Sequence, residues 1–263
     1  MQSIFLDIPA SAVQRTPILQ SWLTQGQAQV ANTRQQGYSR LRLQAEQGTD
    51  ILALLEDVTF QESVRWILRE EQRHYQNLLG AEVYPSFQQQ AQRRILRMEP
   101  QLRTVIGHDL ERLLPAADSF NVNGYLRFSA RKLKRLLRQL LREEYQQMEE
   151  EMEQEEFVEL LRFFVSVQPP LLDCAYLTIY GSRFTLTDEW GNDLRQIYLD
   201  SLLEEEITGV SDNDLLMSIL ITLLPAEIHL EIKELPPAPE FLELLRRVFG
   251  EQLIWHKAET KGK

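Results

Sequence analysis

Cysteine is almost absent from this chain of 263 residues, since Cys174 is the only one. A single thiol cannot form an internal disulfide framework, and this usage is typical of proteins that fold in a reducing compartment. The start, Met1–Asp7, has no basic segment, and Asp7 interrupts it before an apolar run develops. This pattern indicates no secretory signal, so we expect a cytoplasmic protein.

Long apolar runs are also absent. The longest, Leu215–Pro225, has about ten residues where a membrane-spanning helix needs about twenty, so it indicates a buried core helix. We therefore expect no membrane insertion. With 43% hydrophobic and 9% aromatic residues, the chain can build one large core or two modest ones.

Known catalytic and metal-binding patterns are missing as well. There is no glycine-rich nucleotide loop and no nucleophile elbow, and no second cysteine could complete a zinc site with Cys174. The histidines lack the spacing of metal ligands; they are His74, His108, His229 and His256. The sequence thus predicts no catalytic residue, no metal site and no cofactor.

Lysine does not occur before residue 132, and charge is unevenly placed along the chain. The net charge is −1 over residues 1–124, +7 over 125–142 and −17 over 143–263, which gives −11 in total. An acidic surface repels anions over a Debye length of about 8–10 Å. Any anionic partner must therefore meet the segment 125–142 locally.

The first part of the chain, residues 1–118, has mainly helical patterns. Thr59 is a candidate N-cap three residues before Glu62. A short strand is indicated over Arg40–Gln44, where Leu41 and Leu43 alternate with polar residues. Glycine and proline predict breaks in the helices at Gly37, Gly48, Gly80, Pro85, Pro100 and Pro115.

A long helix is predicted to open with Phe120–Phe128 and to run from Leu126 to about Met148. Leucines fall on one side of it, and we interpret them as core rather than as a dimer seam because no heptad persists beyond about three repeats. The opposite side carries cations, namely Arg127, Arg131, Lys134, Arg135, Arg138 and Arg142. The acidic run 149–156 predicts a kink or the start of a new helix near Glu153, and Pro169–Pro170 end the helical stretch.

Strand patterns dominate the last part of the chain. A hairpin is expected from Leu171–Tyr180 and Arg183–Thr187, with Cys174 as an inert core thiol, followed by a turn at 188–193. Helices are expected through Ile197–Leu203 and after an N-cap at Ser211. A strand at 228–232, a helix after Pro236–Pro239 and a strand at 253–255 describe a βαβ unit with parallel strands.

These patterns together predict an α+β protein. Residues 1–118 form a mainly helical region, and the long helix leads into an α+β region, 119–263, with a small mixed sheet. The basic face of the long helix has three interpretations: cations that are solvated or paired with the acids of 143–263, a surface for an acidic protein partner, or a nucleic-acid site.

Four stretches in this order resemble the YtxC-like family of sporulation proteins from endospore-forming bacteria. They are Asn121–Phe128, Phe157–Phe164, Asp214–Thr222 and Val248–Gly250, and the resemblance extends over about 119–257. It implies a cytoplasmic protein associated with spore formation. It implies no activity, cofactor or catalytic residue.

We therefore expect a noncatalytic interaction or structural factor whose partner is a protein. The first alternative is a nucleic-acid-associated regulator that uses the six cations of the basic face. The second is an enzyme whose site is assembled from distant residues, with His229, Glu231 and His256 as a conceivable acid–base group.

Overall fold

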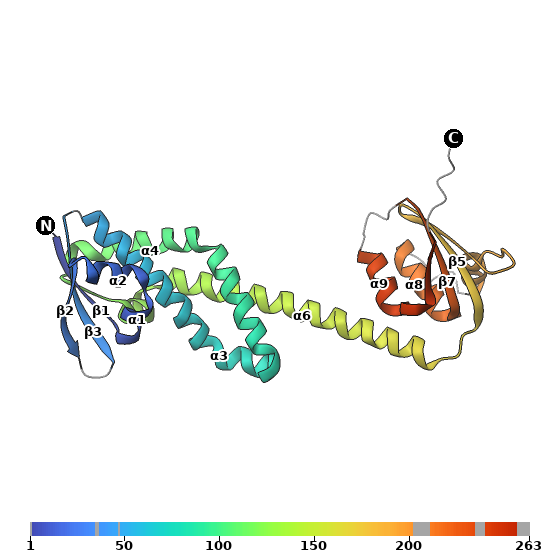
Figure 1. The fold of residues 1–263 in the computed structure, drawn as a ribbon, viewed down its shortest axis with the longest axis horizontal. Helices are drawn as coiled ribbons and strands as arrows, with labels where there is room; N and C mark the ends of the chain where they lie inside the picture. Colours follow the sequence, from blue (N-terminus) through green and yellow to red (C-terminus); the bar gives the residue numbers. More distant parts are fainter. Residues whose placement is uncertain (1, 35–36, 47, 202–210, 235–239, 257–263) are drawn as a thin grey trace. The chain divides into compact units, whose positions relative to one another are not determined.

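The computed structural model describes residues 2–34, 37–46, 48–201, 211–234 and 240–256, which form two compact units, Met1–Glu150 and Glu151–Lys263. Each unit has its own four-stranded sheet and its own hydrophobic core (Figure 1). The predicted α+β class is confirmed. The boundary between residues 118 and 119 that composition suggested stays a prediction.

The first unit combines a mixed sheet with long helices. Its strands lie in the order β2-β3-β1-β4, in which β1 is antiparallel to β3 and parallel to β4. Its elements are β1 (Gln2–Pro9), α1 (Ala10–Arg15), α2 (Pro17–Thr24), β2 (Ala28–Arg34), β3 (Tyr38–Ala45), α3 (Gly48–Arg97), α4 (Glu99–Leu113), β4 (Ser119–Asn121), α5 (Val122–Gly124) and the beginning of α6 (Arg131–Val167).

The predicted strand at Arg40–Gln44 is confirmed within β3, where Leu41 and Leu43 are fully buried. Arg40 also forms a two-bonded ion pair with Asp7 of β1, at 2.6 and 2.7 Å. Strands β1 and β2 were not predicted. Strand β2 has three apolar residues, Ala28, Val30 and Ala31, which do not alternate regularly with its polar ones, so its pairing with β3, and not its own pattern, makes it a strand.

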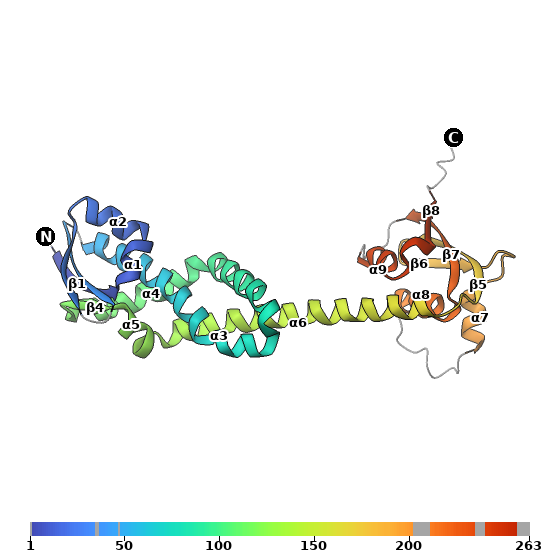
Figure 2. The same ribbon diagram turned by 60° about the horizontal axis from the view of Figure 1, so that its bottom comes forward.

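Helices α3 and α4 pack on this sheet and on α6, and Figure 2 shows them alongside the first half of α6. The predicted break at Gly80 is confirmed, because its φ of 77° and ψ of 167° interrupt α3. The predicted N-cap at Thr59 is wrong. Thr59 lies fully buried inside α3, which begins eleven residues earlier at Gly48 because Ile51, Leu54 and Leu55 extend the apolar face upstream.

The segment Phe120–Phe128 links the sheet to the long helix. Phe120 lies in β4 opposite Leu6 of β1, and the Asn121 side chain caps α5 by accepting a bond from the Gly124 amide at 2.7 Å. One π-helical turn, Tyr125–Ser129, follows and is closed by a bond from the Ala130 amide to the Tyr125 carbonyl. The regular helix therefore starts at Arg131, five residues after the predicted Leu126.

Helix α6 runs without interruption from Arg131 to Val167, so the predicted kink or new helix near Glu153 is wrong. Leu133, Leu137 and Leu141 are buried in the core of the first unit, which confirms the core interpretation of the leucine stripe. Val158 and Val165 are buried in the core of the second unit. The apolar face of α6 shifts around the helix because its first part packs in the core of the first unit and its last part packs in the core of the second. The acidic residues 149–156 belong to neither core and stay exposed and helical.

The second unit has the strand order β6-β5-β7-β8. Strand β5 is antiparallel to β6 and parallel to β7, and β7 is parallel to β8. Its elements, besides the end of α6, are β5 (Leu172–Tyr180), β6 (Arg183–Thr187), α7 (Leu194–Ser201), α8 (Asp212–Leu223), β7 (Pro225–Glu234), α9 (Glu240–Phe249) and β8 (Leu253–His256).

The predicted hairpin, the parallel βαβ pair and the Ser211 cap of α8 are confirmed in this unit. One face of the sheet is buried against helices, with Ala175 and Leu177 of β5 packed beside Leu216 of α8 and Leu245 of α9. Leu202–Leu203 and Pro236–Pro239, which the predictions included, lie outside the described residues. No helix in the described ranges has both the length and the apolar character needed to cross a bilayer.

Candidate functional site

The predicted basic face lies on α6 and on the π-helical turn before it. A groove of about 690 Å³ on α6 brings five of the six predicted cations together, and Gln139, Glu143 and Gln146 complete its lining. The five are Arg131, Lys134, Arg135, Arg138 and Arg142. We call this surface the basic groove. The sixth cation, Arg127, lines a separate cavity.

Only one arginine of the basic groove is held by an ion pair within the described part of its unit. Arg138 Nε donates to Glu71 Oε1 on α3 at 2.6 Å. No carboxylate oxygen among the described residues of the first unit lies within 4.0 Å of Arg131, Arg135 or Arg142, which are exposed. The pairing expected with acids of 143–263 is therefore not formed by Glu143 and Glu144, which bond to Arg94 of α3 instead.

The cavity at Arg127 has a volume of about 300 Å³. Tyr38 and Trp66 line it together with Arg69, and Asn123 donates a hydrogen bond to the Tyr38 hydroxyl. Lys134 connects this cavity to the basic groove, because its ammonium lies over the Trp66 ring at 5.7 Å and donates to the Arg127 carbonyl at 2.8 Å. The aromatic rings of Tyr38 and Trp66 thus lie beside the cations Arg127 and Lys134. The sequence did not indicate this proximity.

A second surface feature lies on the part of α6 that belongs to the second unit. Five exposed residues recur at intervals of three and four along it: Glu153, Glu156, Leu160, Phe163 and Val167. We call them the α6 stripe. Its three apolar members keep 62%, 64% and 57% of their surface exposed, although the core residues Val158 and Val165 lie on the same helix. The sequence showed the apolar residues but not which of them the core would leave uncovered.

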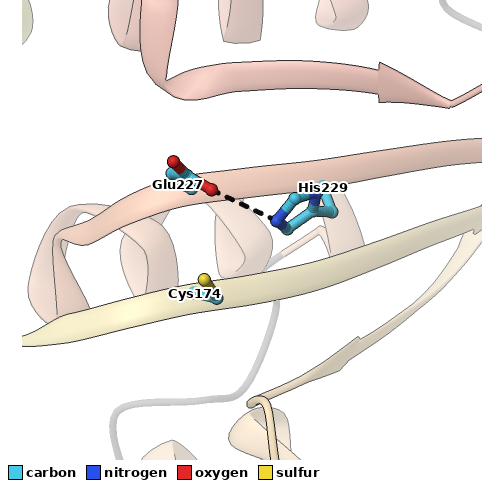
Figure 3. Close-up of side chains that lie close together, drawn as sticks. All are labelled: Cys174, Glu227 and His229. Atoms are coloured by element: carbon cyan, nitrogen blue, oxygen red, sulfur yellow. Dashed lines mark ion pairs between the residues drawn. The ribbon is translucent and has the colours of Figure 1, made fainter.

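A third group lies on the polar face of the second sheet. Cys174 of β5 stands opposite Glu227 of β7, and Tyr176 stands opposite His229. The ligand atoms of Cys174, Glu227 and His229 all lie within 4.8 Å of one another, and Figure 3 shows the three side chains projecting together from the two strands. Cys174 is half-buried on the face away from the core, so its predicted place as a core thiol is wrong. Side chains of a strand alternate, and Ala175 takes the core position.

The predicted acid–base group is only partly assembled. His229 Nδ1 and His256 Nε2 are 2.8 Å apart, whereas Glu231 pairs with Lys233. Burial, and then the negative charges of Glu227, Glu189 and Asp173, raise the pKa of the Cys174 thiol. A thiol in these surroundings is a poor nucleophile. The negative charges of its neighbours would instead stabilise a bound cation.

A family model described as the YtxC-like family matches residues 63–254. The chain belongs to the YtxC-like family. No curated protein and no solved structure matches it.

The match to the YtxC-like family covers most of α3, all of α6 and the second sheet as far as Ile254 in β8. It includes the basic groove, the α6 stripe and the three residues Cys174, Glu227 and His229. Family membership by itself assigns no role to any residue of the chain. The function must therefore be argued from these three surfaces.

Proposed function

We propose that this YtxC-like protein is a noncatalytic interaction factor in sporulation, and that the α6 stripe binds a helix of a partner protein. The observation that carries the proposal is the exposure of Leu160, Phe163 and Val167. Apolar side chains gathered on one exposed face typically mark a protein interface. Their recurrence at three and four residues suits helix-to-helix packing.

The charges beside the apolar residues define the partner. Glu153 and Glu156 continue the α6 stripe toward the N-terminus of the helix, and both are exposed. A second copy packed in parallel would place these carboxylates against each other, and an antiparallel copy would place them against the apolar end of the α6 stripe. Both arrangements are destabilising. The surface therefore fits a different helix, apolar at one end and basic at the other.

The test is affinity capture from a lysate of sporulating cells, with nuclease, using the wild-type chain and the variant L160S/F163S. The control is Leu78→Ser, which removes an apolar residue of similar exposure from α3 in the other unit. We expect a protein that wild type and control retain and the double variant loses. A synthetic peptide of the partner's basic and apolar helix should compete for it. Equal retention by all three proteins, or no competition by the peptide, contradicts the proposal.

The basic groove supports a second candidate function, a nucleic-acid-associated regulator. Exposed arginines that have no carboxylate partner among the described residues of their unit could neutralise phosphates, and Trp66 and Tyr38 could stack on bases. Binding to oligonucleotides should then weaken steeply with salt. R135E/R142E should abolish it, whereas R93E/R97E, which reverses two exposed arginines of α3, should reduce it far less. Unchanged binding by R135E/R142E excludes this candidate.

A further inference from the structure

We propose that Cys174, Glu227 and His229 bind a zinc ion on the polar face of the second sheet, with one coordination position left open to solvent. The inference is independent of the interaction function, because it concerns neither the α6 stripe nor the basic groove. The spacing of these three residues along the chain does not by itself indicate a metal site.

The register of the sheet brings the three ligands together. Cys174 and Glu227 are direct partners in the parallel ladder of β5 and β7, and His229 is two residues further along β7. Residues two apart in a strand project from the same face, so all three side chains point away from the helices (Figure 3). Two adjacent strands deep in a sheet form a rigid support for a site.

The distances are close to those of a coordinated ion. Metal–ligand lengths of about 2.0–2.3 Å place the ligand atoms of a tetrahedral zinc about 3.3–3.8 Å apart. Glu227 Oε2 and His229 Nε2 are already 3.4 Å apart, and all three ligand atoms lie within 4.8 Å. The remaining separations therefore exceed the range of a coordinated ion by no more than about 1.5 Å.

The His229 ring is held in the orientation that a ligand needs. Its Nδ1 lies 2.8 Å from His256 Nε2, and its other nitrogen, Nε2, faces Glu227. Tyr176 stacks on the ring, with centroids 4.8 Å apart and planes at 13°. A histidine that binds metal typically uses its second nitrogen for such an outer hydrogen bond, which sets the tautomer and the direction of the lone pair. His256 is therefore a positioning residue.

The set of donor atoms selects the metal. One thiolate, one imidazole and one carboxylate suit zinc, whereas calcium and magnesium prefer oxygen ligands alone. The Glu227 side chain is 54% exposed and that of His229 only 18%, so the fourth position opens to solvent on the side of Glu227. Three protein ligands with one open position leave room for a water or for a group of another molecule.

The first experiment uses the full chain freed of metal by a chelator and then titrated with Co²⁺ as a spectroscopic substitute for zinc. We expect one equivalent of cobalt to give thiolate-to-cobalt charge-transfer absorption and visible bands of tetrahedral intensity, and one equivalent of Zn²⁺ to abolish both. Saturation with cobalt without charge-transfer absorption overturns the proposal.

Variants separate the ligands from the positioning residue. Cys174→Ser should abolish the charge-transfer absorption, and Glu227→Gln and His229→Gln should weaken zinc binding more than His256→Gln does. His256→Gln should keep the absorption and weaken binding about 10–100-fold, as outer hydrogen-bond partners typically do. The control is Glu231→Gln, on the same face of β7 but paired with Lys233, and it should bind as wild type does. Equal affinity of wild type and Cys174→Ser overturns the assignment.

X-ray absorption of the zinc-loaded wild type tests the same site without any variant. We expect one sulfur neighbour at about 2.3 Å and nitrogen or oxygen neighbours at about 2.0–2.2 Å. A shell of nitrogen and oxygen alone would show that Cys174 is not a ligand.

Discussion

Tyr125 donates a hydrogen bond to Asp109 at 2.8 Å, which ties the π-helical turn before α6 to helix α4. The phenol is buried beside a carboxylate, and burial first, then this bond and the negative charge of Asp109, raise the pKa of Tyr125 well above its usual range. Tyr125 belongs to the segment Asn121–Phe128 that resembles the YtxC-like family. Tyr125 in that segment therefore stabilises the packing of the first unit, whereas Arg127 and Phe128 are exposed.

We predict that Tyr125→Phe lowers the free energy of unfolding of the first unit by about 1.5–3 kcal/mol, the range for a hydrogen bond to a charged group. Scanning calorimetry of the full chain measures the change. The control is Tyr84→Phe, which removes the hydroxyl of another tyrosine whose side chain is buried in the first core and which makes no hydrogen bond to a described residue. Equal losses for the two variants would contradict the role of the Asp109 bond.

Two leucines of α6 should respond very differently to the same substitution. Leu133 is fully buried in the first core, so Leu133→Ala should cost about 2–5 kcal/mol in unfolding free energy. Leu160 is 62% exposed, so Leu160→Ala should change it by no more than about 0.5 kcal/mol. A large loss from Leu160→Ala in the isolated chain would mean that the α6 stripe is part of a core and not an interface.

Asp188 should contribute stability that depends on pH. Burial acts to raise its pKa, but hydrogen bonds from Asn192 and from the amides of Trp190 and Gly191 outweigh burial and hold the pKa below its usual value. The contribution is present above the unfolded pKa of about 3.9 and is lost as pH falls through the lower folded value. Melting curves between neutral and acidic pH should therefore show a smaller acid loss for Asp188→Asn than for wild type. Parallel pH profiles would contradict this.

Zinc should stabilise the second unit if the proposed site binds it. Free zinc at 100 times the dissociation constant should add about 2.7 kcal/mol, because the ion binds the folded state. Calorimetry with and without zinc measures the shift, and Cys174→Ser should lose most of it. A shift of the same size in Cys174→Ser would place the ion elsewhere.

Local patterns were sufficient for the elements that have a strong period of their own. Alternation identified β3 at Leu41 and Leu43, and the hydroxyl of Ser211 identified the start of α8. Strand β2 could not be found this way, because its polar residues follow no period and its bonds come from β3. Helix α6 was expected to break near Glu153, but it is continuous. An interrupted apolar stripe in the sequence is the same whether the helix breaks or whether one continuous helix packs in two different cores.

The sequence by itself determined the α+β class, the family, the basic segment of α6 and the parallel pair at the end of the chain. These features rest on side-chain period, composition and charge, which are local properties. The tertiary structure decided which arginines of the basic groove are paired and which apolar residues of α6 stay exposed. It also decided that Cys174 meets Glu227 and His229. These three outcomes depend on strand register and on packing between segments far apart in the chain, and no local pattern contains that information.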